Sequence, residues 1–146
     1  MSINKSGKWW TGSEPNDIKE YLEAYAPEGY EADEFRLSNC KCSSKTFYLY
    51  SDDDEGVAKR VCIDCEKEHF ICDSEDFWNE AKPKEHTCVE CQSNSVNIGV
   101  AFSLYENRDG VKWIYIGYRC DNCGVLGCCA GWKIGESGSN FLMDQV

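Results

Sequence analysis

Eight of the eleven cysteines fall into four tight pairs, and this pattern constrains the chain more than any other feature. The first two pairs enclose a run of 19 residues and the last two enclose a run of 28 residues, and both runs read as strand, turn and strand. A short turn between two cysteines aims both thiolates at one point, and two such turns at the ends of a hairpin place four sulfurs in a tetrahedron. The pattern predicts two four-cysteine metal sites, one formed by Cys40, Cys42, Cys62 and Cys65 and the other by Cys88, Cys91, Cys120 and Cys123.

Disulfides and thiol redox chemistry are the alternatives to metal. The N-terminal stretch MSINKSGKWWTGS lacks the apolar core of a secretory signal, so we expect a cytoplasmic protein with reduced thiols. Reduced thiols in close pairs favour metal binding over disulfides. A redox or thiol-sensor role stays open because CxxC pairs can oxidise when a metal leaves, but no CxxC begins a helix in a βαβ pattern.

The pair Cys40-Lys41-Cys42 departs from the usual CxxC spacing because it is one residue short. A tight CxC can still chelate one ion, so we keep this site in the prediction. His69, four residues beyond Cys65, would be the substitute if one of these cysteines did not ligate. The plainer interpretation of His69 is a strand residue beside the cysteine turn, and the same holds for His86.

The eight paired cysteines resemble those of the zinc-ribbon (rubredoxin-like) superfamily over residues 40–72 and 88–129. The resemblance implies a fold and a metal, but little about activity. It implies Zn²⁺, two ions per chain. Iron is the competing metal because tetrahedral coordination by four sulfurs suits both ions. The turns CVEC, CIDC and CDNC lack the C-P-x-C-G surroundings of rubredoxin, which makes iron the less favoured choice.

The two cysteine-bounded halves read as copies of one unit of roughly 40 residues. Strands are expected at residues 47–50 and 57–61 in the first copy and at 96–105 and 111–118 in the second. FYLY at 47–50 matches FSLY at 102–105, and both halves contain the looser pattern R-(x)-CxxC. A later cysteine (Cys72; Cys128 and Cys129) and then a tryptophan (Trp78; Trp132) follow each closing pair.

Two helices complete the predicted fold. Residues 13–25 carry an apolar stripe of Ile18, Leu22 and Tyr25, with Ser13 as the expected N-cap. Residues 73–81 form a second, short linking helix. We predict a mainly β, small α+β protein, with an N-terminal helical segment at 1–36, a first zinc ribbon at 37–84, and a second ribbon with a C-terminal tail at 85–146.

Three cysteines stay outside the predicted sites. Cys72, Cys128 and Cys129 could be reactive or palmitoylated thiols. Free cysteine also behaves as a small hydrophobic residue, and we predict that these three fill the core.

Charge and site chemistry limit the function classes. The net charge is −11, and eight thiolates with two Zn²⁺ ions would bring it to about −15. A zinc with four cysteine ligands has no open position for water, so we expect no enzyme. No apolar run approaches the length of a membrane span.

We expect a zinc-stabilised protein that acts through protein–protein interaction, for example as an immunity or inhibitor protein for a basic partner. Its acidic stretches at residues 28–34, 52–55 and 73–80 offer surfaces to such a partner or simply keep the protein soluble. The alternative is a nucleic-acid-associated zinc ribbon in transcription or translation, with Trp9, Trp10, Trp113 and Tyr115 stacking on bases. The negative charge makes nucleic acid the less favoured partner.

Overall fold

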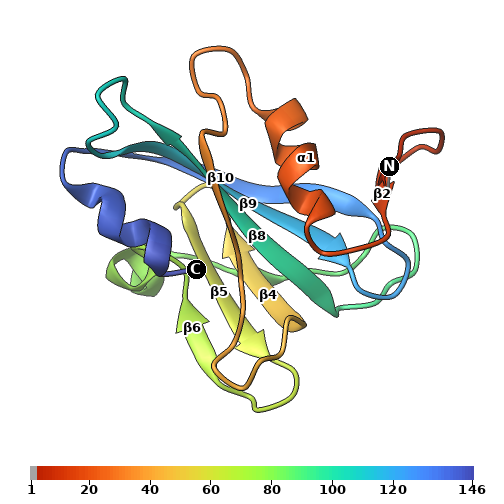
Figure 1. Ribbon diagram of the computed structural model, residues 1–146. Helices are drawn as coiled ribbons and strands as arrows, with labels where there is room; N and C mark the ends of the chain where they lie inside the picture. Colours follow the sequence, from red (N-terminus) through yellow and green to blue (C-terminus); the bar gives the residue numbers. More distant parts are fainter. Residues whose placement is uncertain (1–2) are drawn as a thin grey trace.

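Two three-stranded antiparallel units build the molecule, and they share one sheet. The computed structural model describes residues 3–146 and places the strands in the order β10-β9-β8-β4-β5-β6 (Figure 1). The first unit consists of β4 (Phe47–Asp52), β5 (Val57–Cys62) and β6 (Glu68–Phe70), and the second of β8 (Val96–Leu104), β9 (Val111–Cys120) and β10 (Leu126–Glu136). The predicted mainly β fold is confirmed.

The two units meet where Phe47 pairs with Val96. Each of these residues lies five positions after the second cysteine of its unit. Phe47 lies opposite Cys62 across its own hairpin, and Val96 lies opposite Cys120. Antiparallel pairing between equivalent residues relates the two units by an approximate two-fold rotation.

Each unit also donates a short strand to the other. Strand β3 (Glu34–Leu37), which precedes the first cysteine pair, joins β8 of the second unit, and β7 (Lys84–Glu85), which precedes the third pair, joins β4 of the first. The backbone N–H of Ser38 donates to Ile98 O at 2.8 Å, and that of His86 donates to Leu49 O at 2.7 Å, in the equivalent place. The exchange ties the two metal-site regions into one structure.

The predicted repeat is confirmed, but two of its proposed matches are wrong. The cysteine ends set the true register, in which FYLY at 47–50 corresponds to residues 96–99 and not to 102–105. The hairpin of the second unit is longer at its tip, away from the cysteines. The similar stretch FSLY therefore lies nearer the tip than the residues that are equivalent to FYLY. Trp78 lies in the 3-10 helix η1 and Trp132 in strand β10, so these two residues are not equivalent.

Both faces of β8 are covered, and every residue of this strand is buried. On one face, strands of the first unit pack against the second unit around Phe47, Leu49, Phe102, Ile114 and Ile116. On the other face lies helix α1 (Asp17–Tyr25), drawn in orange in Figure 1. The helix buries Ile18 and Leu22 against β8 and β9.

Helix α1 begins four residues later than the expected cap. Ser13 does not cap it; the Asp17 carboxylate instead accepts the N–H of Glu14 at 3.1 Å. The chain before the helix forms a tight turn, in which the N–H of Ile18 donates to Pro15 O. Gly117 lies beneath the helix, and a Cβ there would come within 2.7 Å of Ile18 Cγ2. The missing side chain allows the helix to lie close to the sheet.

The remaining elements are short. The predicted linking helix is η1 (Ser74–Glu80), and a second 3-10 helix, η2 (Ser139–Asp144), follows β10. Strands β1 (Ile3–Asn4) and β2 (Thr11–Gly12) form a separate two-stranded sheet. Within residues 3–146, no helix has the length and apolar character needed to cross a membrane.

Candidate metal centres

The eight predicted ligands come together as two groups of four. Within each group all four Sγ atoms lie within 4.8 Å of one another. The shortest separations in the first group are 3.5 Å between Cys40 and Cys65 and 3.6 Å between Cys42 and Cys62. A zinc tetrahedron with bonds of about 2.3 Å has edges of about 3.8 Å, so either group could hold one ion after a small adjustment.

The second group repeats this arrangement. Its sulfurs approach to 3.5 Å between Cys88 and Cys123 and to 3.5 Å between Cys91 and Cys120. In the described part of the chain, no histidine, aspartate or glutamate joins either group. The donor set is therefore sulfur alone in both, which suits Zn²⁺ or iron.

All four cysteine pairs share one backbone frame. In each pair, the N–H of the residue directly after the second cysteine donates to the carbonyl of the first, and the N–H of the first cysteine donates to the carbonyl two places after the second. The first bond joins Ser43 to Cys40 (2.8 Å), Glu66 to Cys62 (2.9 Å), Gln92 to Cys88 (3.0 Å) and Gly124 to Cys120 (2.8 Å). The second joins Cys40 to Ser44, Cys62 to Lys67 and Cys88 to Ser93 (2.9 Å each), and Cys120 to Val125 (2.8 Å).

The short Cys40-Lys41-Cys42 turn keeps both of these closing bonds. Its inner bond spans three residues in place of four, which absorbs the missing position. The departure from CxxC spacing therefore leaves this site with the same frame as the others.

Each turn ends in the left-handed backbone region. The residue after the second cysteine has φ of 78° at Ser43, 65° at Glu66, 67° at Gln92 and 86° at Gly124. Only glycine adopts this conformation without a steric cost, so the other three turns carry local strain. A single glycine among four different residues gave no recognisable sequence signal for this shared feature.

Backbone and side-chain donors favour ionisation of at least one thiol in each group. The Asn122 side chain and the N–H of Ser93 lower the pKa of Cys91 to about 6. Burial opposes ionisation of Cys62, but the N–H groups of Cys65 and Asp64 outweigh it and lower the pKa to about 6. Thiolates are the metal-binding form of cysteine, so these donors favour binding.

Other thiols in each group resist ionisation because they are buried or crowded by neighbouring sulfurs. The N–H of Ser44 favours the Cys42 thiolate, but the adjacent Cys62 sulfur raises its pKa to about 12. Burial, together with the Cys88 sulfur, raises the pKa of Cys123 to about 12. A cation at the centre of each group would supply the positive charge that allows all four sulfurs to ionise.

Arg60 places a buried positive charge beside the first group. Burial lowers the pKa of this guanidinium, and the sulfurs of Cys40 and Cys62 act in the opposite direction. Its Nε donates to the backbone oxygen of Val146 at 2.9 Å. A Zn²⁺ with four thiolates carries a net charge of −2, and Arg60 would offset part of it. The sequence marked this arginine only as part of a repeat.

The two histidines lie outside both groups. His69 lies in β6, where it pairs with Arg60, so its interpretation as a strand residue is confirmed. His86 packs its ring on Tyr118, with 4.1 Å between ring centroids. Burial lowers the pKa of both imidazoles, and the buried Nε2 atom of each lacks a hydrogen-bond partner among the described residues. The four cysteines of the first group need no histidine substitute.

The remaining three cysteines act as core residues, as predicted. Cys72 is buried, and Cys128 and Cys129 pack against opposite hydrophobic clusters. Burial raises the pKa of Cys72 and Cys128 to about 12 and that of Cys129 to about 11. These thiols stay protonated at neutral pH and have low reactivity.

No protein-family model, curated protein or solved structure matches this chain. Its resemblance to the zinc-ribbon superfamily therefore stays a proposal, carried by the spacing of the cysteines and by the geometry of their turns.

Proposed function

We propose that this chain is an acidic binding protein, stabilised by two structural zinc ions, that captures a basic protein partner. The observation that carries the proposal is an acidic groove with two exposed phenylalanine rings, between η1 and η2. The metal groups would support that groove and take no part in chemistry.

Four cysteine ligands give zinc a closed coordination shell, with no position for a water or substrate. Ions bound in this way would hold the cysteine turns together and add folding free energy that such small hairpins lack. Within residues 3–146, the buried Nε2 atoms of His69 and His86 have no hydrogen-bond partner that would orient either imidazole as a base. These features favour a binding function over an enzyme.

The groove has a volume of about 600 Å³, and its lining residues come mainly from η1, η2 and β6. Figure 1 shows these three elements close together. Phe77 and Phe141 line it with 43% and 60% of their surfaces exposed. Large exposed apolar side chains rimmed by polar groups mark interaction sites.

Five carboxylates surround these rings, and no lysine or arginine lines the groove. The carboxylates belong to Glu68, Asp73, Glu75, Asp76 and Glu136. Glu68 pairs with Lys59 at 2.6 Å, and the other four have no ion pair within residues 3–146. A segment that combines lysine or arginine with an apolar side chain fits this surface.

A basic partner also fits the whole molecule, whose net charge is −11. Opposite charge speeds the encounter of two proteins and excludes partners of like charge. A sharper form of the proposal is an immunity or inhibitor protein that covers a basic, nucleic-acid-processing enzyme or toxin. The alternative role in nucleic-acid binding is less favoured, because a net charge of −11 repels a phosphate backbone.

The test is capture of a partner at low salt by the immobilised, zinc-loaded protein. We expect a protein of high isoelectric point that elutes as the salt concentration rises. Its affinity should fall at least about tenfold in the double variant Glu75→Gln/Asp76→Asn, which removes two groove charges.

The matched control is Glu14→Gln/Glu20→Gln, which removes the same charge from exposed positions at the start of α1. This control should bind within about twofold of the original protein. If both variants lost the same affinity for the partner, net charge alone would explain the loss and the groove would have no specific role. Salt-insensitive capture, or none at low salt, would contradict the basic-partner proposal itself.

A further inference from the structure

A second pocket, on the face of the sheet that carries α1, is lined mainly by aromatic rings. Its volume is about 650 Å³, and it lies between the end of α1, the loop that follows it and strands β9 and β10. Its lining residues are Tyr25, Pro27, Tyr30, Asp53, Trp113, Tyr115, Cys128 and Gly131. Tyr25 and Tyr30 expose 53% and 43% of their surfaces, so the pocket opens to solvent.

The four rings support one another in perpendicular pairs. Tyr25 meets Tyr115 with 6.0 Å between centroids and 84° between planes, and Tyr30 meets Trp113 at 5.7 Å and 73°. The Tyr115 hydroxyl donates to Tyr30 O at 2.7 Å and so joins the two pairs. A Cβ on Gly131 would come within 3.0 Å of Trp113 Nε1, so this glycine lets the rings lie against β10.

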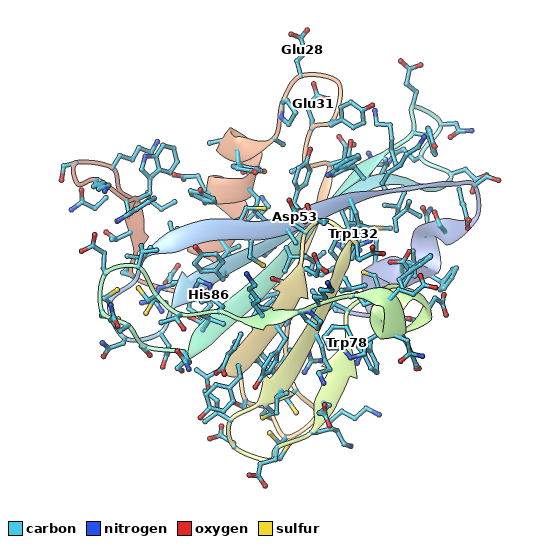
Figure 2. All side chains as sticks on the ribbon, turned by 180° about the vertical axis from the view of Figure 1, so that it is seen from behind. Glu28, Glu31, Asp53, Trp78, His86 and Trp132 are labelled. Carbon is cyan, nitrogen blue, oxygen red and sulfur yellow. The ribbon has the colours of Figure 1, made fainter. Side chains whose placement is uncertain are left out.

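Asp53 supplies the only charge among the lining residues. The N–H of Gly131 donates to its Oδ1 at 2.9 Å, which holds the carboxylate at the pocket, and it has no ion pair within the described chain. Figure 2 shows Glu28 and Glu31 on the loop above and Asp53 below them. The Cys128 thiol stays neutral, since burial raises its pKa to about 12. A ligand that enters this pocket meets ring faces and negative charge.

We propose that this pocket binds an alkylated ammonium group, presented as a methylated lysine side chain on a partner protein. Aromatic faces carry negative charge density and attract cations. A trimethylated ammonium has no N–H group to satisfy, so several rings and one carboxylate match it better than they match a primary ammonium.

The ring of Tyr30 already receives a cation from within the chain. The Lys112 ammonium lies 4.8 Å from its centroid and donates to Gly29 O. Lys112 does not line the pocket. Within residues 3–146, no lysine or arginine lies over the other three rings of the pocket, Tyr25, Trp113 and Tyr115.

This proposal rests on the proposed function in one respect: the partner protein would supply the methylated lysine. Its chemistry is tested without any partner, by titration of the zinc-loaded protein with tetramethylammonium. NMR follows the Trp113 indole N–H signal. The electrically neutral comparison compound is 3,3-dimethyl-1-butanol, which has the shape of choline without the charge.

We expect saturable shifts with tetramethylammonium and at least about tenfold weaker binding of the neutral alcohol than of choline. Asp53→Asn should weaken tetramethylammonium binding at least about threefold, since the amide keeps the acceptor for Gly131 but removes the charge. Asp54→Asn makes the same charge change on an exposed neighbour and should stay within about twofold. Absent binding, or equal binding of choline and the alcohol, would overturn the ammonium site.

The source is tested with three ligands: a trimethyllysine peptide, its unmodified counterpart and choline. The proposal predicts that the trimethyllysine peptide binds at least about tenfold more tightly than either of the others. An unmodified peptide that binds equally well, or choline that binds as tightly as the methylated peptide, would overturn the assignment to methylated lysine. If these peptides did not bind, the proposed capture of a basic partner at the η1–η2 groove would still stand or fall on its own test, because that groove contains none of the four rings.

Discussion

Phe47 and Val96 pair with each other across the sheet and occupy the same place in two copies of one repeat. The strands that precede the two copies are exchanged around this pair: β3 joins the second unit and β7 joins the first. Such reciprocal pairing makes the units dependent on each other, because each unit forms backbone pairs with a strand from the segment that precedes the other unit.

This dependence predicts that the two metal sites unfold together. Cys91→Ser should remove one metal ion and lower the melting temperature of the whole chain by about 10 °C or more, in a single transition. Circular dichroism and metal analysis provide the two readouts. Cys129→Ser, a change outside both groups, should retain both ions. Two separate transitions, with one unchanged, would show independent ribbons.

The shared left-handed turn position predicts unequal losses of stability when its two equivalent residues, Gly124 and Gln92, are replaced. Gly124 has a φ of 86°, and a Cβ there would come within 2.6 Å of Gly12 O, so Gly124→Ala should lower the free energy of unfolding by at least about 2 kcal/mol. Gln92 occupies the same place at φ 67°, and Gln92→Gly should change it by less than about 1 kcal/mol. Urea titration of both variants measures the difference, and equal destabilisation would refute the steric explanation.

Helix α1 owes its position to a few buried side chains. Leu22 is fully buried, and its Cδ1 lies where a Cβ on Gly117 would approach to 2.8 Å. Leu22→Ala should lower the free energy of unfolding by about 3 kcal/mol, because it leaves a cavity between helix and sheet. Glu20→Ala, an exposed change in the same helix, should cost less than about 0.5 kcal/mol. Comparable losses in the two variants would argue against this packing.

The contact between Asp73 and Trp132 predicts that the stability gained by replacing Asp73 depends on pH. The indole Nε1 of Trp132 donates to Asp73 Oδ1 at 3.0 Å, yet burial raises the pKa of this carboxyl above its usual value. Because the pKa of Asp73 is higher in the folded state, the folded protein binds this proton more tightly than the unfolded chain. The stability that the protonated carboxyl contributes is present at low pH and is lost as the pH rises through the folded-state pKa.

Asp73→Asn keeps the acceptor for Trp132 but removes the half-buried charge. The variant should be more stable than the original protein near neutral pH, and its advantage should shrink as the pH is lowered toward the pKa of Asp73. Urea unfolding across that range measures the difference, with exposed Glu75→Gln as the control. If the extra stability of Asp73→Asn increased as the pH was lowered, a raised pKa of Asp73 could not be its cause.

Local sequence signals predicted the hairpins and the eight paired cysteines, because cysteine spacing and strand alternation act over short distances. They could not predict the exchange of β3 and β7, which depends on pairing between residues as far apart as Leu37 and Gly99. Cys128 and Cys129 follow the last cysteine pair, where the sequence leads us to expect one more strand. The glycines and polar residues of the tail hide the rest of β10, an edge strand that pairs with β9.

The site was predicted more fully than its surroundings. All eight cysteines fall into the expected groups, and even the short Cys40–Cys42 turn keeps the common frame. The buried Arg60 beside the first group and the ring pocket around Trp113 required the fold, because their members come from separate strands and loops.

Native mass spectrometry of the purified, reduced protein measures the number and the identity of its bound metal ions. We expect a mass that corresponds to two zinc ions per chain, and chelation should remove both ions and unfold the protein. One zinc ion would show that one of the two four-cysteine groups does not bind metal, and the short Cys40–Cys42 turn makes the first group the one to test. Iron, or a metal-free chain with the mass loss of disulfide formation, would contradict the two structural zinc sites.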